Sequence, residues 1–288
     1  MSNDETVFNI DKIVFGTLSA QEILNMGVCE INSNKLNGLG SVYDERMGVI
    51  ENGKICLKCE KDNKSCTGHF GYIELHQPII HPLYYKTIIL FLKCFCYKCS
   101  SILFTENQIK LNKLSKFRGR ILFNKILEKI DKEIDICPNC SAPKPKITYS
   151  IAENQILMTH KKGKDNFKIE LVEEDIKKIF ENITDTDFTL LGFDPKQTHP
   201  KNLVLTVLPV LPIISRPYIM TDGITCDDDL TLNYLEIVKI NNHLKNKDIS
   251  ETKRKKYIQT INFRVKCLFD NSHDKAKHSN GRPLKSLK

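Results

Sequence analysis

Apolar residues recur with helical spacing in several stretches of the chain. The capping box Ser19-Ala-Gln-Glu22 precedes Ile23, Leu24 and Val28, so a short helix is predicted to begin there. The same spacing predicts helical structure over residues 83–93, 105–132, 173–183, 229–246 and 251–269. Each of these segments has an apolar face, which is expected to lie in a core.

Shorter stretches alternate apolar and polar residues, as half-buried strands do. Residues 72–75 are predicted to form a short strand that ends at Pro78 and Pro82. Residues 146–150 and 155–160 flank Ala152-Glu153-Asn154 and are predicted to pair as a β-hairpin. A β-rich run at residues 203–217, LVLTVLPVLPIISRP, is interrupted by prolines. Helices mixed with short β-hairpins predict an irregular α+β fold.

Three consecutive aspartates, Asp227, Asp228 and Asp229, stand at the start of the predicted helix over residues 229–246. Acidic groups are favourable there because they cap the helix and complement its dipole. Consecutive side chains on a helix diverge, and no Asp-x-Asp-x-Asp loop accompanies them. We therefore interpret them as capping residues and not as a magnesium site.

A metal-binding motif follows a glycine-rich loop over residues 32–53. Cys56, Cys59, Cys66 and His69 form the pattern C-x2-C-x6-C-x2-H. Two thiols separated by two residues can bind one ion from a tight turn, and the second pair completes a tetrahedron suited to zinc. Gly68 lies within the second pair, where a residue that tolerates positive φ favours a turn. Burial in a core would not produce this spacing, so a structural zinc site is predicted.

A second set of thiols is divided by a long insertion. Cys96 and Cys99 form one C-x2-C pair, and Cys137 and Cys140 form the other. The insertion costs little because the entropy of closing a loop grows only logarithmically with its length. Cys94 competes as a ligand, but its C-x-C spacing with Cys96 suits one tetrahedron less well, so it is predicted to be a buried small hydrophobe. Two structural zinc ions are therefore expected.

Composition places the chain among folded proteins of a reducing compartment. Its 288 residues are 41% hydrophobic and 27% charged, enough for a sizeable core. The first ten residues lack the features of a signal peptide, and the apolar stretches are too short to span a bilayer. Eleven cysteines in such a chain indicate metal ligands before disulfides. We expect a soluble intracellular protein with no membrane partner, of cellular or viral origin, and the sequence does not decide between the nucleus and the cytoplasm.

Positive charge is concentrated near the C-terminus. The net charge is +8, but residues 239–288 contain fourteen Lys and Arg against four Asp and Glu, which leaves the rest slightly acidic. A polyanion is the natural partner of such a segment, and a solvated helix face with excess lysine is the alternative. The candidate nucleic-acid contacts on the last predicted helix are Lys253, Arg254, Lys255 and Lys256.

A series of sequence blocks occurs in an order typical of one protein family. The blocks are Phe15-Gly16 with the following capping box, MGVIENGKICLKCEKDNKSCTGHFGYIELHQPIIHP at 47–82, Cys96-x2-Cys99, residues 187–193, LTVLPVLPIISRP at 205–217 with DDLT at 228–231, and GRPLKS at 281–286. Together they resemble the N-terminal clamp region of the largest subunit of multisubunit DNA-directed RNA polymerases of the eukaryotic, archaeal and large-DNA-virus type. The resemblance covers nearly the whole chain.

The resemblance implies a zinc-stabilised clamp, a mobile element that closes over DNA and the RNA–DNA hybrid. It assigns the two sets of four ligands to two zinc sites, within a clamp head at residues 1–200. Residues 201–288 would form clamp-core helices and a segment similar to the lid loop, near the point where RNA leaves the template. That segment adds Lys275, Lys277 and Arg282 as candidate nucleic-acid contacts. The implied partners are the second-largest and other polymerase subunits, the remainder of the largest subunit, DNA and the hybrid.

The sequence departs from the family in what it lacks. It contains no catalytic barrel and no loop of three aspartates to hold the catalytic magnesium. No catalytic residue is therefore assigned to this chain. Magnesium is expected only in the complete enzyme, bound outside this chain. The chain alone is predicted to be inactive. Either the gene is split or the sequence is a fragment.

Two other functional classes compete with a polymerase subunit. A free-standing zinc-binding transcription regulator or adaptor is the alternative, and co-purification with polymerase subunits would distinguish it. A zinc enzyme is disfavoured because catalytic sites keep an open coordination position, whereas both predicted sites have four protein ligands. The sequence also lacks His-Glu-x-x-His.

Overall fold

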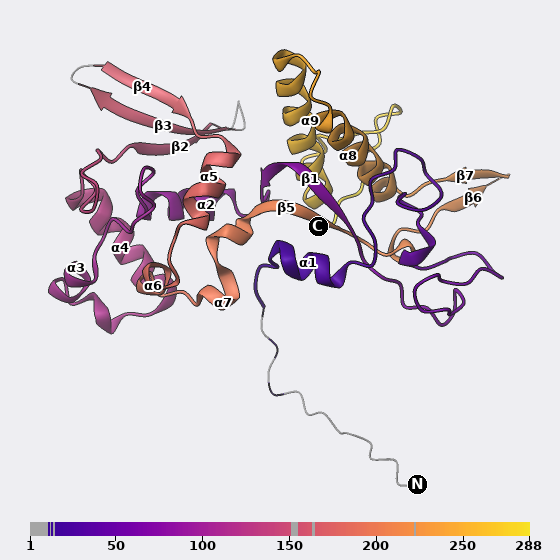
Figure 1. The fold of residues 1–288 in the computed structure, drawn as a ribbon, viewed down its shortest axis with the longest axis horizontal. Helices are drawn as coiled ribbons and strands as arrows, with labels where there is room; N and C mark the ends of the chain where they lie inside the picture. Colours follow the sequence, from indigo (N-terminus) through magenta and orange to yellow (C-terminus); the bar gives the residue numbers. More distant parts are fainter. Residues whose placement is uncertain (1–10, 12, 14, 151–154, 163–164, 222) are drawn as a thin grey trace, which may run out of the picture.

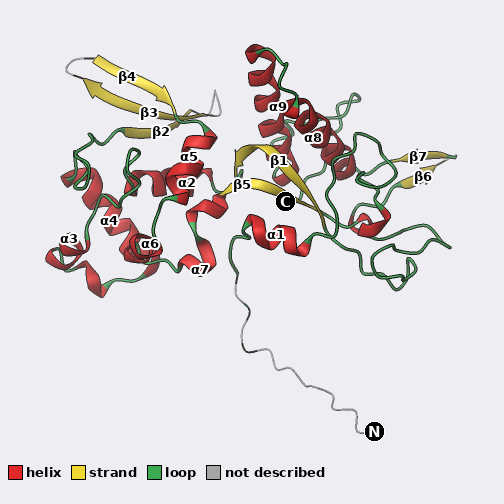
Figure 2. Cartoon of the chain, viewed as in Figure 1, coloured by secondary structure: helices red, strands yellow, loops and turns green. Residues whose placement is uncertain are grey.

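The computed structural model describes residues 11, 13, 15–150, 155–162, 165–221 and 223–288. The α-helices in these ranges are α1 (Ala20–Met26), α2 (Tyr85–Cys94), α3 (Glu106–Leu111), α4 (Gly119–Glu133), α5 (Glu173–Glu181), α6 (Asp185–Leu190), α7 (Pro195–Thr198), α8 (Asp229–Lys245) and α9 (Glu251–Phe269). The strands are β1 (Gly71–Ile80), β2 (Lys146–Ser150), β3 (Gln155–Lys162), β4 (Asp165–Glu170), β5 (Val204–Val210), β6 (Ile219–Thr221) and β7 (Ile224–Cys226). This mixture confirms the predicted α+β class (Figures 1 and 2).

A two-stranded ribbon lies at the centre of the molecule. Strand β1 pairs antiparallel with β5, from Gly71 opposite Val210 to Ile80 opposite Val204. The prediction that the first strand ends at Pro78 is wrong, because β1 continues to Ile80. The register shifts between Glu74 and Ile79, so Pro78 lies in an irregularity where no regular ladder bond has to be donated.

The first hydrophobic cluster lies at one end of the ribbon, among α2, α4, α5, α6 and the sheet of order β2-β3-β4 (Figure 1). Four phenylalanines form its aromatic centre, with ring centroids 5.1–5.6 Å apart in each contacting pair: Phe91, Phe123, Phe188 and Phe193. Offset and edge-on aromatic pairs of this kind stabilise beyond their buried area. This end of the molecule therefore has a substantial core of its own.

The second cluster lies toward the other end of the ribbon. Helices α8 and α9 pack against each other and against β1, while α1 contacts β5 (Figure 1). The buried residues include Ile73, Leu208, Tyr234, Ile237 and Val265. The segment before β1 joins the same cluster through Ile31, Val42 and Met47, so it is packed against the C-terminal helices.

A buried arginine ties this segment to α8. Arg216 is fully buried, donates from Nη1 to Thr231 Oγ1 at 3.0 Å, and also donates to the backbone oxygens of Leu211 and Val42. Its guanidinium lies 5.7 Å from the ring centroid of Tyr43. These bonds satisfy the buried cation and hold the irregular chain that leads to the first cysteine motif.

Of the predictions for single elements, some are confirmed and others are wrong. The capping box at α1 is present, with Ser19 N donating to Glu22 Oε2 at 2.7 Å. The predicted hairpin is formed by β2 and β3. Its predicted turn residues 152–154 lie outside the described residues. A third strand, β4, pairs with β3 and was not predicted. The helical insertion is interrupted, since Lys113 has a left-handed φ of 54° between α3 and α4. Within the described ranges, no helix combines the length and apolar character required to cross a bilayer.

Candidate metal centres and cationic groups

The first cysteine motif forms a compact cluster of ligand atoms. The donor atoms of Cys56, Cys59, Cys66 and His69 all lie within 4.8 Å of one another. Cys66 Sγ is 3.7 Å from His69 Nε2. A tetrahedral zinc with Zn–S and Zn–N bonds of about 2.3 and 2.05 Å would place such a pair about 3.6 Å apart. The donor set and its dimensions therefore fit a zinc ion.

The second motif forms an equivalent cluster from distant parts of the chain. The thiols of Cys96, Cys99, Cys137 and Cys140 lie within 4.8 Å of one another. Cys96 Sγ is 3.6 Å from Cys140 Sγ, and Cys99 Sγ is 3.6 Å from Cys137 Sγ. Tetrahedral zinc with four thiolates would give separations of about 3.8 Å. Cys94 is fully buried outside this group, which confirms the prediction that it is a buried residue.

The same backbone turn is found at each C-x2-C pair. The amide of the first cysteine donates to the carbonyl five residues later, at 2.9 Å for Cys56, 2.9 Å for Cys96 and 2.8 Å for Cys137. The residue four positions after each first cysteine has a left-handed φ of 55–57° and donates back to it: Glu60, Ser100 and Ser141. The left-handed residue in this turn is not evident from the sequence, because none of the three is glycine.

Backbone amides also point at two of the sulfurs in the first centre. Lys58 N and Gly68 N lie 3.4 Å from the thiols of Cys56 and Cys66, respectively. Gly68 has a φ of 82°, and a Cβ there would lie 2.6 Å from Pro212 Cβ. Glycine is therefore required both by the turn and by the close approach of the chain, as the sequence indicated for the turn.

The thiols of the first centre differ in their environments. Hydrogen bonding to His69 lowers the pKa of the Cys59 thiol to about 6, whereas burial raises the pKa of Cys66 to about 11. Cys56 is fully buried, while Cys59 is half-buried. A buried thiolate needs a positive partner, which a coordinated metal ion would supply.

The two centres differ in the structure around them. Val49, Cys56 and Cys66 form a small buried cluster of their own at the first centre. The buried thiols of the second centre, Cys96 and Cys137, belong to the large first hydrophobic cluster. Few buried apolar residues therefore stabilise the chain around the first centre, whereas many stabilise the chain around the second.

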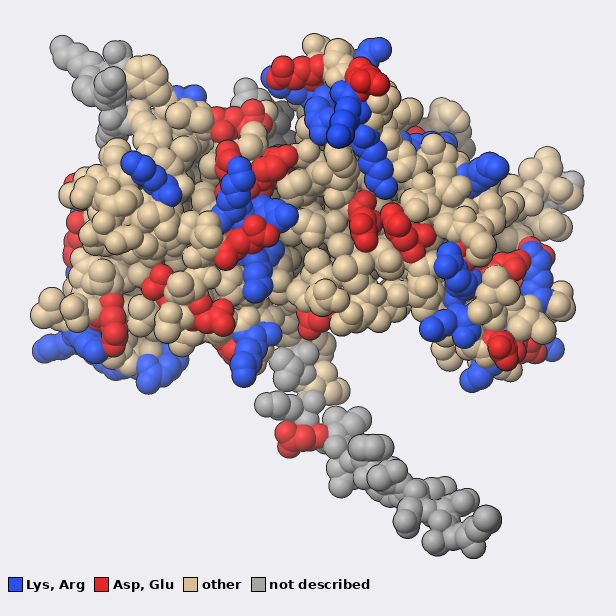
Figure 3. Space-filling model, in the orientation of Figure 1, with Lys and Arg blue, Asp and Glu red and all other residues tan. Residues whose placement is uncertain are grey.

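The predicted nucleic-acid residues lie in two separate groups. Lys253, Arg254, Lys255 and Lys256 are in the first turns of α9, where Figure 3 shows a concentration of basic side chains. Lys275, Lys277 and Arg282 lie beyond the other end of that helix. With a rise of about 1.5 Å per residue, the part of the helix between Lys256 and Phe269 is about 20 Å long. The structure therefore does not bring these seven residues into one patch.

Within the first group the side chains are not equivalent. Lys253, Lys255 and Lys256 are exposed, whereas Arg254 is partly buried with Nη2 3.5 Å from His76 Nε2. Lys255 also forms an ion pair with Glu251 at 3.4 Å. Exposed pairs of this kind are weak, so these cations remain available to a polyanion.

Comparisons with known proteins agree with the motifs. The family model described as RNA polymerase Rpb1, domain 1, matches residues 8–288. The chain is 34% identical to a probable DNA-directed RNA polymerase II subunit RPB1 homolog of Invertebrate iridescent virus 6, over 93% of this chain and 27% of that protein. It is 35% identical to the DNA-directed RNA polymerase subunit Rpo1N of Methanocaldococcus jannaschii, over 100% of this chain and 22% of that protein.

A third relative is matched over a larger share of its length. The chain is 31% identical to the DNA-directed RNA polymerase II subunit RPB1 of Euplotoides octocarinatus, over 97% of this chain and 64% of that protein. The chain thus spans between about a fifth and two thirds of these curated relatives. The family match covers almost all of the present sequence, so the chain belongs to the RNA polymerase Rpb1 domain 1 family, the N-terminal region of the largest RNA polymerase subunit.

Proposed function

We propose that this chain forms the zinc-binding clamp of the largest subunit of a DNA-directed RNA polymerase, which closes over DNA and the RNA–DNA hybrid during transcription. The observation that carries the proposal is the presence of two complete four-ligand clusters in a chain of this family. Both clusters use only protein ligands, as structural zinc sites do.

Two zinc ions are the proposed metals. Cys56, Cys59, Cys66 and His69 would hold one ion, and the other would be held by Cys96, Cys99, Cys137 and Cys140. When bound, each ion supplies a cross-link among four side chains and has no open position for catalysis. The turns at the cysteine pairs orient the thiols, and the surrounding chain holds the pairs together.

We further propose that residues 1–200 form the clamp head and residues 201–288 form the core helices and lid-like segment. The chain passes from the first hydrophobic cluster to the second between Val204 and Leu205, which supports a boundary near residue 200, although Ile31, Val42 and Met47 of the N-terminal part also pack in the second cluster. The β1–β5 ribbon would join the two parts, because β1 belongs to the N-terminal part and β5 to the C-terminal part.

Nucleotidyl transfer is proposed for the complete enzyme and not for this chain alone. The sequence has no loop of three aspartates able to hold magnesium at the phosphates of a nucleotide. The remainder of the largest subunit and the second-largest subunit are the proposed protein partners. They would supply the catalytic region and the opposite wall of the DNA cleft.

Purification of the tagged chain from the cells that normally express it tests this assignment. We expect the second-largest polymerase subunit to co-purify in equal amount and to remain bound in moderate salt. A free-standing adaptor would purify without the polymerase core, and that outcome would contradict the proposed role.

Replacement of Lys253, Arg254, Lys255 and Lys256 by glutamine is expected to weaken binding to double-stranded DNA of mixed sequence. Each lost phosphate contact should reduce the slope of log affinity against log salt by about 0.9. The effect should not depend on DNA sequence, because lysine contacts to phosphates do not identify bases. Affinity measured by fluorescence anisotropy from low to moderate salt provides the measurement.

A charge-matched control is available on the other end of the molecule. Lys110, Lys113, Lys116 and Arg120 are exposed residues of the α3–α4 segment. Their replacement by glutamine removes the same formal charge. If both variants change the slope equally, the first turns of α9 are a solvated face and not a DNA contact.

A further inference from the structure

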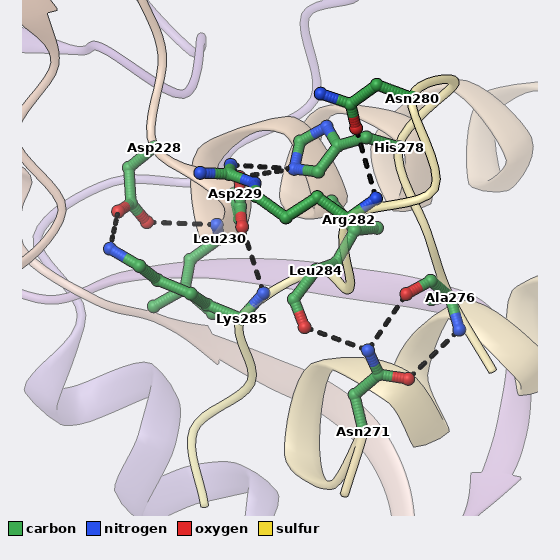
Figure 4. Close-up of polar contacts among 10 residues, drawn as sticks. All are labelled: Asp228, Asp229, Leu230, Asn271, Ala276, His278, Asn280, Arg282, Leu284 and Lys285. Atoms are coloured by element: carbon green, nitrogen blue, oxygen red, sulfur yellow. Dashed lines mark hydrogen bonds and ion pairs between the residues drawn. The ribbon is translucent and has the colours of Figure 1, made fainter. Parts of the chain in front are cut away.

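The chain after α9 folds into a closed loop, here called the C-terminal loop, over residues 271–285. The Asn271 side chain holds its neck: Nδ2 donates to Ala276 O at 2.9 Å and to Leu284 O at 2.8 Å, and Oδ1 accepts from Ala276 N at 3.0 Å (Figure 4). Backbone bonds join the two arms, with His278 N donating to Arg282 O at 2.8 Å. The loop is thus an ordered hairpin.

A buried aspartate at the start of α8 fastens this loop to the helix. Asp229 is 3% exposed. Its Oδ1 lies 2.8 Å from His278 Nε2 and 2.9 Å from Arg282 Nη2, and its Oδ2 accepts from Lys285 N at 3.0 Å (Figure 4). A carboxylate only accepts, so we assign the tautomer in which His278 Nε2–H donates to it. The donors come from both arms of the loop.

Capping does not account for Asp229. The cap of α8 is its neighbour Asp228, whose Oδ1 accepts from Leu230 N at 3.0 Å. The Asp228 carboxylate also lies 3.7 Å from Lys285 Nζ. The Asp229 carboxylate has instead all of its described hydrogen bonds to the C-terminal loop.

The burial of Asp229 makes this attachment strong. A buried carboxylate is costly unless it is paired and hydrogen-bonded, and bonds to ionised groups are stronger than neutral ones. Release of the loop would remove the three described donors from Asp229 together, and water would have to replace them. The loop is therefore held more firmly than its exposed position suggests.

The loop displays positive charge while it is held. Lys275 and Lys277 are exposed, and the Arg282 side chain is 61% exposed. The hydrogen bond from Arg282 to Asp229 uses Nη2 only. A guanidinium has five donors in a rigid fork, so the remaining donors can meet a phosphate without breaking the bond to Asp229.

We propose that Asp229 is a positioning residue, which fixes the C-terminal loop so that Lys275, Lys277 and Arg282 meet the phosphates of a nucleic acid in one preformed arrangement. The inference rests on the proposed nucleic-acid role of this chain. Because the loop is ordered before binding, association does not have to pay for ordering it.

Asp229→Asn gives a test in which the loss of charge and the loss of positioning should change the affinity for nucleic acid in opposite directions. Removal of one negative charge near a cationic surface should by itself strengthen binding to a polyanion. Loss of the carboxylate should instead loosen the loop and weaken binding of labelled double-stranded DNA by about five- to tenfold at 0.1 M salt, the amount expected for one lost phosphate contact. The slope of log affinity against log salt should become smaller.

A second variant removes the possibility that Asp229→Asn acts through general misfolding. Asn271→Ala opens the neck of the same loop without any change of charge and should weaken binding in the same way. Asp248→Asn is the charge control, since Asp248 is exposed in the connection between α8 and α9. Hydrogen exchange should increase at the amides of Ala276 and Lys285 in both loop variants, with zinc content unchanged.

The outcomes separate the inference from the function on which it rests. If the parent chain binds DNA and Asp229→Asn binds as tightly as Asp248→Asn or more tightly, the positioning role is refuted while the nucleic-acid role stands. If the parent chain, with both zinc ions bound, does not bind DNA even at low salt, the nucleic-acid role fails and the inference fails with it.

Discussion

Zinc content is expected to fall from two ions per chain to one when Cys59 is replaced by serine. Structural zinc contributes on the order of 10 kcal/mol to the folding of small metal-binding units. At the first centre the surrounding cluster consists of little more than Val49 and the thiols themselves. Without the ion, residues 48–70 should lose their fixed structure, and loosening should extend toward Gly40 and Pro82.

The second centre should keep its ion in this variant, because its thiols belong to a large hydrophobic cluster at the other end of the β1–β5 ribbon. Cys226→Ser is the matched control, since Cys226 is exposed and belongs to neither group of ligands. Elemental analysis gives the metal content, and hydrogen exchange locates the loosened segment. One zinc or none in the parent chain, or two in Cys59→Ser, would contradict the assignment.

The second large effect concerns acid stability and His81. This ring lies 4.8 Å from Tyr84 and 4.8 Å from Phe269 between centroids, and its Nδ1 accepts from Leu83 N at 3.3 Å. Burial lowers the pKa of His81 from 6.5 to about 4. Between these values the unfolded chain binds a proton that the folded chain does not, so the free energy of unfolding rises with pH in this window.

The contribution of His81 is therefore complete above about pH 6.5 and is lost as the pH falls toward 4. Between pH 7 and pH 5, protonation of His81 in the unfolded chain should lower the free energy of unfolding of the parent by up to about 2 kcal/mol. His81→Asn keeps an acceptor for Leu83 N but does not titrate, so it should lose less stability over the same interval. Acid release of metal affects both proteins alike and cancels in the comparison.

Urea unfolding at pH 7 and pH 5 measures the difference between parent and variant. His273→Asn serves as the control because His273 is exposed in the C-terminal loop. Equal pH dependence of the parent and His81→Asn would show that burial does not lower the pKa of His81 in the folded chain.

Errors in the sequence predictions arose where backbone geometry depends on a neighbouring segment. Pro78 usually ends a strand, but here β5 pairs on both sides of an irregularity and the strand continues. The insertion between the cysteine pairs has helical periodicity, yet Lys113 takes a left-handed conformation and divides it. Strand β4 was not predicted because its edge position leaves Phe167 and Ile169 about half exposed, without a clear apolar face.

The sequence by itself determined the fold class, the family and the eight proposed metal ligands. Ligand choice depends on residue type and short spacing, which the covalent chain fixes, since two thiols three positions apart are close in any tight turn. Tertiary structure alone decided the partners of Asp229, because His278 and Arg282 follow it by 49 and 53 residues and reach it only when α9 packs against α8.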